Sequence, residues 1–366
     1  MIIFKRSDEN PVLLPNPDNN WESEATFNGS AVNYKGKVVL LYRAESFSSG
    51  NDGPNKSTSS IGYASSKDGI HFHDRHQLIR AEQEWEQYGC EDPRVTRLDG
   101  KHYIFYTALS KYPFTAEGIR VGLAITTDFK KIEAKHPVTT FNAKAMALFP
   151  ERINGKIAAV LTANTDNPPA KIAIAYFDDE TQIWSEKYWE NWYQSLNSHV
   201  ISLERSSHDQ IEVGAPPIKT KYGWLLIYSH IQNYFSPPAV FGIEAALLSL
   251  NNPAEVLGRT KKPLLIPREE YERYGRVPNI VFPSGALVKG KELHLYYGAA
   301  DTTCAQASIE LETMLLQILG TADAPELKRF FDNPILSPNP QNSWETQATF
   351  NAGVIYEKSR VHLVYR

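Results

Sequence analysis

Five stretches of the chain repeat one strand-like pattern, and this repeat constrains the fold more than any other feature of the sequence. Each stretch starts at a glycine turn and continues with alternating apolar and aromatic residues, which is typical of a β-strand. The starts are Gly36, Gly100, Gly155, Gly223 and Gly290, so the period is about 64 residues. A unit of that length holds four strands with insertions, and five such units predict an all-β fold, a five-bladed β-propeller.

A second pattern follows four of the five stretches and supports the same prediction. A strand, a turn rich in Asp or Asn, and a returning strand are expected from Ile61, Val121, Ile172 and Ile243 onward. A β-sandwich would also be all-β, but it does not account for so long a period. Residues 310–320 have either the periodicity of a helix or the pattern of a last strand, and the sequence leaves both open.

A longer duplication sets the expected domain boundaries. Residues 10–43 recur without a gap as residues 333–366, with about half of the positions identical. We therefore predict a propeller domain over residues 1–320 and a separate repeat over residues 321–366. The repeat either closes the ring or begins a second, similar domain, and the sequence alone does not decide between the two.

Composition excludes several classes of protein. A net charge of -4 with interspersed signs gives no basis for a nucleic-acid surface. The chain has no apolar run of roughly 18 residues and no leader-like start, so we expect no membrane partner and a cytoplasmic location. Cys90 and Cys304 are far apart, and the histidines lack metal-ligand spacing. We therefore expect no metal and no cofactor, and homo-oligomerisation stays open.

The most specific polar cluster is the sequence EDPR at residues 91–94. Pro93 is expected to hold Asp92 in an extended conformation, which would fix the direction of its carboxylate. A rigid Asp92 beside Arg94 suits a catalytic acid or an acceptor for sugar hydroxyls. An ordinary salt bridge in a turn is the alternative.

Further carboxylates stand at comparable places in other repeats, namely Glu212, Glu244 and Asp301. Glu244 is conspicuous because its strand is otherwise apolar, and a buried carboxylate needs a partner or a function. Exposure at the edge of a sheet is the alternative for Glu244. Converging carboxylates suit cleavage of a glycosidic bond, because one acts as acid and another activates water. Asn28 and Arg43 suit sugar hydroxyls, but each is equally compatible with a structural role.

Taken together, a series of motifs resembles glycoside hydrolase family 130 over about residues 8–320. The motifs are, in order, ATFNGSAV, LLYRAE, YGCEDPRVTRLDGKHYIFYTA, ALFPERINGK, VGAPPIKTKYGWLLIY, AALLSLNNP, VPNIVFPSGALV and LHLYYGAADT. This resemblance implies a five-bladed propeller that acts on β-mannosides, as an inverting phosphorylase or as a hydrolase.

The resemblance also implies roles for single residues. Asp92 matches the family's proton donor, which acts on the glycosidic oxygen through the 3-hydroxyl of mannose. Lys144 matches a lysine of the phosphate site in phosphorylases. Asn28, Arg43 and Asp301 match family positions that hold the sugar. Beside these matches, we expect Glu91 and Arg94 of the EDPR sequence to bind substrate.

One departure from the family pattern concerns the phosphate site. Phosphorylases read HRP where this chain has Leu161, Thr162 and Ala163, so the His and Arg that bind phosphate are missing. His230, or an arginine that the sequence does not identify, is expected to compensate, whereas Glu244 replaces a glycine of the phosphorylase pattern. Because phosphate needs cationic partners, added carboxylates favour water as the acceptor.

We therefore predict inverting hydrolysis of a mannose-containing oligosaccharide, as in a β-1,2-mannosidase. Asp92 is the expected proton donor, and Glu244 or Glu212 is the expected base that activates water. One alternative is an inverting β-mannoside phosphorylase, with inorganic phosphate as co-substrate and mannose 1-phosphate as product. A carbohydrate-binding propeller without catalysis is the other.

Overall fold

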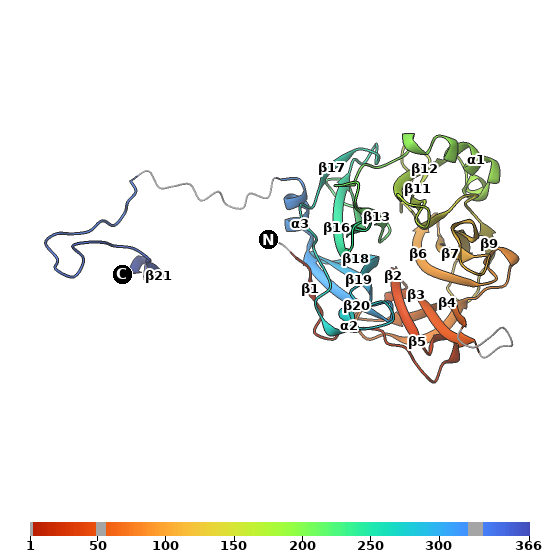
Figure 1. Cartoon of the computed structure of the whole chain (residues 1–366), viewed down its shortest axis with the longest axis horizontal. Coiled ribbons are helices and arrows are strands. Elements are labelled where there is room, and N and C mark those ends of the chain that lie inside the picture. The colour runs from red at the N-terminus through yellow and green to blue at the C-terminus, as the bar shows by residue number, and fades with distance from the viewer. Residues whose placement is uncertain (1–2, 49–55, 321–331) are drawn as a thin grey trace. The chain divides into compact units, whose positions relative to one another are not determined.

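The strands of the protein fall into two separate units. The computed structural model describes residues 3–48, 56–320 and 332–366 (Figure 1). It divides into unit 1, residues 1–322, and unit 2, residues 323–366. Both units are built from antiparallel strands, so the all-β prediction is confirmed.

Among the residues that the structure describes, unit 1 contains four sheets, which we divide into five groups of antiparallel strands. Groups 1 and 2 belong to one eight-stranded sheet, joined by a single parallel bridge between Ser59 and Gly89. Group 1 consists of β2 (Ala25–Tyr34), β3 (Lys37–Ser48), β4 (Lys56–Ser66) and β5 (His73–Ile79). Group 2 consists of β6 (Gly89–Leu98), β7 (Lys101–Leu109), β8 (Ile119–Thr126) and β9 (Ala134–Pro137). Group 3 consists of β10 (Ala143–Leu148), β11 (Ile157–Ala163) and β12 (Lys171–Phe177). Group 4 consists of β13 (Gln210–Val213), β14 (Ile218–Lys219), β15 (Trp224–Gln232), β16 (Val240–Leu248) and β17 (Val256–Arg259). Group 5 consists of β18 (Val281–Lys289), β19 (Glu292–Ala299), β20 (Thr303–Glu310) and the N-terminal β1 (Lys5–Arg6).

The repeated pattern of the sequence corresponds to β3, β7, β11 and β19, each the second strand of its group, and to β15 in group 4, which follows β13 and the short β14. The second sequence pattern predicts four returning strands. Three of these strands form, as β5, β9 and β17. The fourth prediction is wrong, because β12 is followed by a 3-10 helix (Glu180–Trp184) and by α1 (Glu186–Gln194). Ser185 caps α1, and Trp189 and Trp192 are buried against groups 2 and 3. The apolar side chains of a returning strand are thus replaced by the buried face of a helix.

The other helical segments are short. The segment at residues 310–320 is a helix, α3 (Leu311–Ile318), because the Glu310 side chain caps its N-terminus and Met314 and Leu315 are buried. The remaining ones are α2 (Glu270–Arg273) and 3-10 turns at Asn20–Glu22, Glu84–Glu86, Ala116–Gly118 and Leu196–Ser198. Within the described ranges, none of these helices has the length and apolar character of a membrane span.

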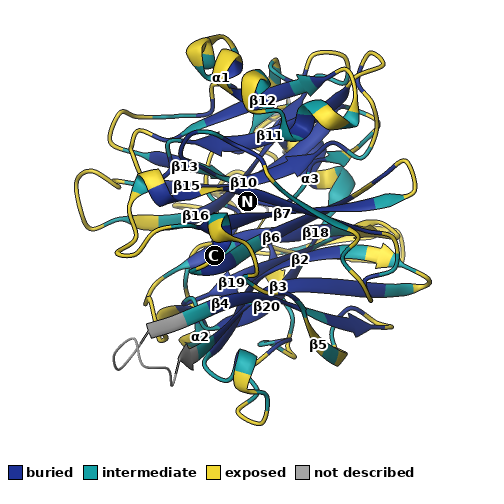
Figure 2. Ribbon diagram, turned by 90° about the vertical axis from the view of Figure 1, so that its right-hand side faces the viewer, coloured by how far each residue is buried: buried dark blue, intermediate teal, exposed yellow. Residues whose placement is uncertain are grey.

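The hydrophobic cores of unit 1 lie between neighbouring groups in a cyclic order. Separate buried clusters join groups 1 and 2, 2 and 3, 3 and 4, and 4 and 5. A fifth cluster, which includes Leu40 and Tyr296, joins group 5 back to group 1. The first strands β2, β6 and β18 contact one another, and their labels lie toward the middle of unit 1 in Figure 1. Figure 2 shows the strands as the most buried part, whereas α1 and the loops carry exposed residues.

Unit 2 contains one hairpin, β21 (Gly353–Glu357) and β22 (Arg360–Val364), whose strands pair with each other. It repeats local contacts of the first copy: Tyr365 donates to Glu345 at 2.6 Å, as Tyr42 donates to Glu22 at 2.6 Å. The strand β20 pairs with β19 on one side and with the N-terminal β1 on the other, so β1 joins the two ends of unit 1. That residues 321–366 either close a ring or begin a second, similar domain stays a prediction.

Candidate active site

The first strands of groups 1, 2 and 3 each carry a β-bulge at the same register. The bulges lie after Phe27 in β2, after Glu91 in β6 and after Lys144 in β10. Asn28 and Asp92 follow these positions with φ angles of 52° each. The left-handed backbone of Asp92 contradicts the extended conformation expected from Pro93. Asn and Asp tolerate this region, and a bulge re-aims the side chain at the point where it interrupts pairing.

The two bulges bring the side chains of Asp92 and Asn28 together. Asn28 Nδ2 donates a hydrogen bond of 2.7 Å to Asp92 Oδ1. Arg43 Nη1 lies 3.7 Å from the same oxygen. A Cβ atom at Gly298 would lie 2.1 Å from Asn28 Oδ1, so this position must be glycine for Asn28 to keep its place. The predicted residues Asn28, Arg43 and Asp92 therefore form one cluster.

Arg43 organises the acids around Asp92. It forms ion pairs with Glu45 at 2.5 Å and with Glu91 at 2.7 Å. Burial raises the pKa of Asp301 to about 6, although the neighbouring Arg43 opposes the shift. Asn28 Oδ1 and Arg43 Nε are buried and have no hydrogen-bond partner among the described residues. Because buried polar atoms normally have partners, these two are suited to the hydroxyls of a ligand.

Arg94 binds the backbone on two strands, and its role in substrate binding stays a prediction. Its guanidinium is buried, and it donates to the backbone oxygens of Asp92 and Pro93 at 3.0 Å each. Its Nε donates to the Gly214 oxygen at 2.5 Å. Burial lowers the pKa of Arg94 to about 10. Arg94 thus joins the bulge of β6 to the chain just after β13, and so holds Asp92 in register with the strand that carries Glu212.

Glu212 and Lys144 lie on the next two first strands, β13 and β10. Lys144 Nζ forms an ion pair of 2.7 Å with Asp166 Oδ1. Burial raises the pKa of Glu212 to about 7, opposed by Lys144 and reinforced by the negative charges of Asp166 and Asp92. The charges of Asp166 and Asp92 thus act on Glu212, and the Arg94 bond to Gly214 joins the strands that carry the two acids Asp92 and Glu212.

The residues that replace the HRP sequence of phosphorylases supply no cation here. Leu161 is fully buried and belongs to the core between groups 2 and 3. Thr162 Oγ1 accepts a hydrogen bond of 2.8 Å from the Val213 backbone N–H. That bond ties β11 to β13 directly beside Glu212.

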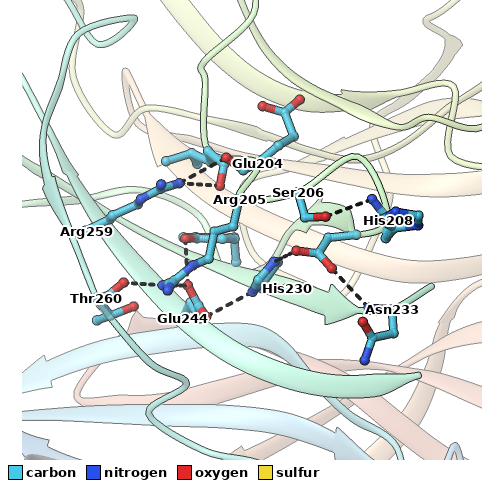
Figure 3. A network of polar contacts seen from close by, with 12 residues as sticks. Glu204, Arg205, Ser206, His208, His230, Asn233, Glu244, Arg259 and Thr260 are labelled. Atoms are coloured by element: carbon cyan, nitrogen blue, oxygen red, sulfur yellow. Dashed lines mark hydrogen bonds and ion pairs between the residues drawn. The ribbon is translucent and has the colours of Figure 1, made fainter. Parts of the chain in front are cut away.

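Glu244 and His230 belong to a separate buried network, drawn in Figure 3. Glu244 contacts Arg205 at 2.5 Å and His230 at 3.0 Å, and His230 contacts Asp209 at 3.0 Å. Although burial opposes the shift, His230 and Arg205 lower the pKa of Glu244.

The strand register separates this network from Glu212. Glu212 pairs with Ser229 of β15, whereas Glu244 pairs with the adjacent Tyr228. Adjacent strand residues point to opposite faces, so Glu212 and Glu244 lie on opposite faces of one sheet. The assignments of Glu244 as base and of His230 as a phosphate partner are corrected accordingly.

The burial of the Glu244 carboxylate is explained by a contact that recurs in other strand groups. Four groups each bury a carboxylate that pairs with a tyrosine hydroxyl and a cation. The four sets are Tyr42–Glu22–Arg75, Tyr106–Glu86–Lys135, Tyr228–Glu244–Arg205 and Tyr297–Glu272–Arg6. Three of the acids precede the first strand of their group, and in group 4 the acid comes from β16 instead. Glu244 therefore holds group 4 together.

We expect Glu244→Ala to lower the free energy of unfolding by about 3 kcal/mol, because it leaves Arg205 and His230 without their shared carboxylate. Urea denaturation would measure this loss. The folded fraction should keep its turnover per molecule, since Glu244 faces away from Asp92. Unchanged stability together with lost turnover would instead indicate that Glu244 takes part in catalysis.

Asp166 is the site residue that the sequence reasoning missed. It follows the strand β11 by three residues, much as Asp301 follows β19. Asp301 was selected as a candidate because it closely follows a repeated strand. The same criterion could have identified Asp166 as well. Its partner Lys144 lies 22 residues earlier, and only the register of β10 and β11 brings the two together.

The cluster as a whole suits a neutral ligand with many hydroxyls. Its cations are already matched, Arg43 by Glu45 and Glu91, and Lys144 by Asp166. In the part of the chain that the structure describes, no three His, Cys, Asp or Glu side chains are grouped as metal ligands. The remaining carboxyls of Asp92, Asp301 and Glu212 can accept hydroxyl protons or exchange protons with a substrate.

Comparison with known proteins gives consistent matches. The model of the family described as beta-1,4-mannooligosaccharide phosphorylase, glycoside hydrolase family 130, matches residues 6–319. A 1,2-beta-oligomannan phosphorylase from Thermoanaerobacter sp. (strain X514) is 35% identical over 319 residues, 85% of this chain and 99% of the relative. A beta-1,2-mannobiose phosphorylase from the same organism is 36% identical over 321 residues, 85% of this chain and 99% of the relative. The solved beta-1,2-mannobiose phosphorylase from Listeria innocua, in complex with beta-1,2-mannobiose, has a TM-score of 0.69 and 27% identity, and the match covers 86% of this chain and 99% of that one.

Proposed function

This chain belongs to glycoside hydrolase family 130 and is an enzyme that acts on β-mannosides, and we propose that it transfers the mannosyl group to water with inversion. The observation that carries this proposal is the acidic surrounding of Lys144. Asp166 already pairs with this lysine, and Glu212 lies beside it. A mannose-containing oligosaccharide is the proposed substrate, in keeping with the names of the relatives. A cytoplasmic location and self-association remain predictions.

We also propose that the five strand groups are the blades of a five-bladed β-propeller. The cyclic order of the five cores supports this assignment, because it returns from group 5 to group 1. In a propeller the first strands surround the central axis. The loops and bulges of these strands would then frame one site, with Asp92 on β6, Lys144 on β10 and Glu212 on β13.

In the proposed mechanism, Asn28 and Arg43 hold the terminal mannose and Asp92 acts as the acid. The bond between C1 and the glycosidic oxygen breaks, and that oxygen receives a proton that originates from Asp92. Glu212 removes a proton from a water molecule as the water oxygen bonds to C1 from the opposite side. Arg94 keeps the acid and the base in register through its bonds to the backbone on both strands.

Phosphorolysis is the second candidate, and the names of the relatives favour it over hydrolysis. Phosphate would then bond to C1 and mannose 1-phosphate would be released. What speaks against it is charge: the carboxylates of Asp166, Glu212 and Glu91 surround Lys144 and raise its pKa despite its burial. A phosphate dianion would enter an acidic surrounding without the paired cations that it normally requires.

The proposed activity can be tested with β-1,2- and β-1,4-linked mannobiose in phosphate-free buffer. We expect mannose to be released from the β-1,2-linked disaccharide, in line with the linkage named for the most similar relatives. Cleavage that appears only after phosphate is added would favour phosphorolysis. Binding without cleavage in either buffer would favour a carbohydrate-binding protein without catalysis.

The pH dependence of kcat/KM should follow the protonation state of the catalytic base. Burial raises the pKa of Glu212 to about 7, and a base must be deprotonated to accept a proton from water. We therefore expect the acidic limb of the kcat/KM profile for mannose release to rise with pH up to about 7. A pH profile of wild-type enzyme measures this. A rate that is already maximal at pH 5 would contradict the role of Glu212.

A further inference from the structure

We propose that Asp166 determines the acceptor of the mannosyl group, because it neutralises Lys144 and so keeps phosphate from binding beside C1. This inference rests on the proposed function and adds to it a residue that sets acceptor specificity. Asp166 makes no contact with Asp92 or Asn28 in the structure's hydrogen bonds and ion pairs, so it acts through Lys144. It is a positioning residue, not a catalytic one.

The pair is held firmly in place. Asp166 Oδ1 contacts Lys144 Nζ at 2.7 Å, and Asp166 Oδ2 accepts from Asn142 Nδ2 at 2.9 Å. The Asp166 backbone N–H donates to Asn142 Oδ1 at 2.8 Å, so Asn142 binds both the main chain and the side chain. Asn142 is itself buried. The Asp166 side chain therefore cannot easily rotate away and leave Lys144 free to bind an anion.

The loop that carries Asp166 is shaped for this contact. Asn164 has a left-handed backbone with φ of 61°, and its N–H donates to the Asn142 oxygen at 2.8 Å. The N–H of Asn167 closes the turn on the Asn164 oxygen at 3.1 Å. The chain thus bends back over β10 as it leaves β11, and this bend presents Asp166 to Lys144.

The charges that act most strongly on Lys144 are negative. The charged groups with the largest effects on its pKa are the acids Asp166, Glu212 and Glu91. The arginines of the cluster are engaged, since Arg43 pairs with Glu45 and Glu91, and Arg94 binds backbone oxygens. A neutral water molecule meets no penalty in this surrounding, whereas a phosphate dianion is repelled.

Both acceptors lead to balanced reactions, so the choice between them is one of binding. In each case the bond from C1 to the glycosidic oxygen breaks, and the departing oxygen gains a proton that originates from Asp92. Water then gives C1 an oxygen and passes a proton to Glu212, whereas phosphate gives C1 an oxygen and needs no base.

The test is the affinity for inorganic phosphate of Asp166→Asn compared with wild type. Asparagine keeps an acceptor for Asn142 but removes the charge, so Lys144 becomes available. We expect phosphate to bind the variant about tenfold more tightly or better, measured by calorimetry and by competition with mannose release. Mannose 1-phosphate should also appear among the products of the variant when phosphate is present.

Two further variants make the result specific. Asp178→Asn removes an equal charge from an exposed pair with Lys156 in the same strand group and should leave phosphate affinity unchanged. In Asp166→Asn combined with Lys144→Met, the gain in phosphate affinity should disappear. A folded Asp166→Asn variant whose phosphate affinity stays within about twofold of wild type would overturn the proposal. If wild-type enzyme required phosphate for cleavage, the proposed hydrolysis would be wrong. The comparison of phosphate affinities would still test the role of Asp166.

Discussion

Replacing Asp92 by asparagine should lower kcat/KM for a β-mannoside by about 10³-fold, because the departing oxygen then loses its proposed proton donor. Asparagine retains an oxygen that can accept from Asn28 Nδ2, so the bulge and its contacts should persist. Initial rates with the preferred mannobiose measure the loss. Calorimetry should find that the sugar still binds.

The matched control is Asp99→Asn, which removes the same charge from an exposed pair with Arg152 in the same strand group. This control should keep wild-type turnover, and thermal unfolding should find both variants folded. If Asp92→Asn kept more than about a tenth of wild-type activity, Asp92 would not be the acid.

Glu212→Gln should abolish hydrolysis nearly as completely, by about 10²-fold or more, since the attacking water then lacks its base. The same change should stabilise the protein at alkaline pH. The pKa of Glu212 in the folded protein is raised to about 7 from an ordinary value of 4.5. Its contribution to stability is therefore present below the ordinary value and is lost as the pH rises through about 7. The gain in Tm of the variant over wild type should be larger at pH 8 than at pH 5.

Glu244→Gln is the informative comparison for this prediction. It changes the other candidate acid in the same way, but on the opposite face of the sheet. We expect it to keep turnover and to lose stability, the reverse of Glu212→Gln. If Glu244→Gln lost turnover while Glu212→Gln kept it, the assignment of the base would be wrong.

The strands could be predicted from the sequence because the pattern that specifies each strand lies within a few consecutive residues. Alternating apolar residues after a glycine turn mark β3, β7, β11, β15 and β19, and all five form. The helix α1 was missed because Trp189 and Trp192 are buried only through contact with groups 2 and 3. The bulge at Asp92 was missed because the rule for residues before proline describes isolated chains, whereas pairing with β7 imposes a left-handed backbone here.

The site was harder to predict, because its contacts join residues that are distant in the chain. Asp92 and Asn28 are 64 residues apart and meet only because both first strands bulge at the same register. Glu244 attracted attention as an acid in an apolar strand, but its partner Arg205 lies 39 residues earlier, in a loop without a recognisable pattern. Whether an acid is catalytic or structural depends on such partners, which a single sequence does not reveal.

The most direct test of the central claim is the fate of the mannosyl group in ¹⁸O-labelled water with millimolar phosphate present. Mass spectrometry would quantify labelled mannose and mannose 1-phosphate over the same time course. We predict ¹⁸O-labelled mannose as the main product, formed at the same rate when phosphate is omitted. Mannose 1-phosphate as the main product, with no cleavage in the absence of phosphate, would contradict the account.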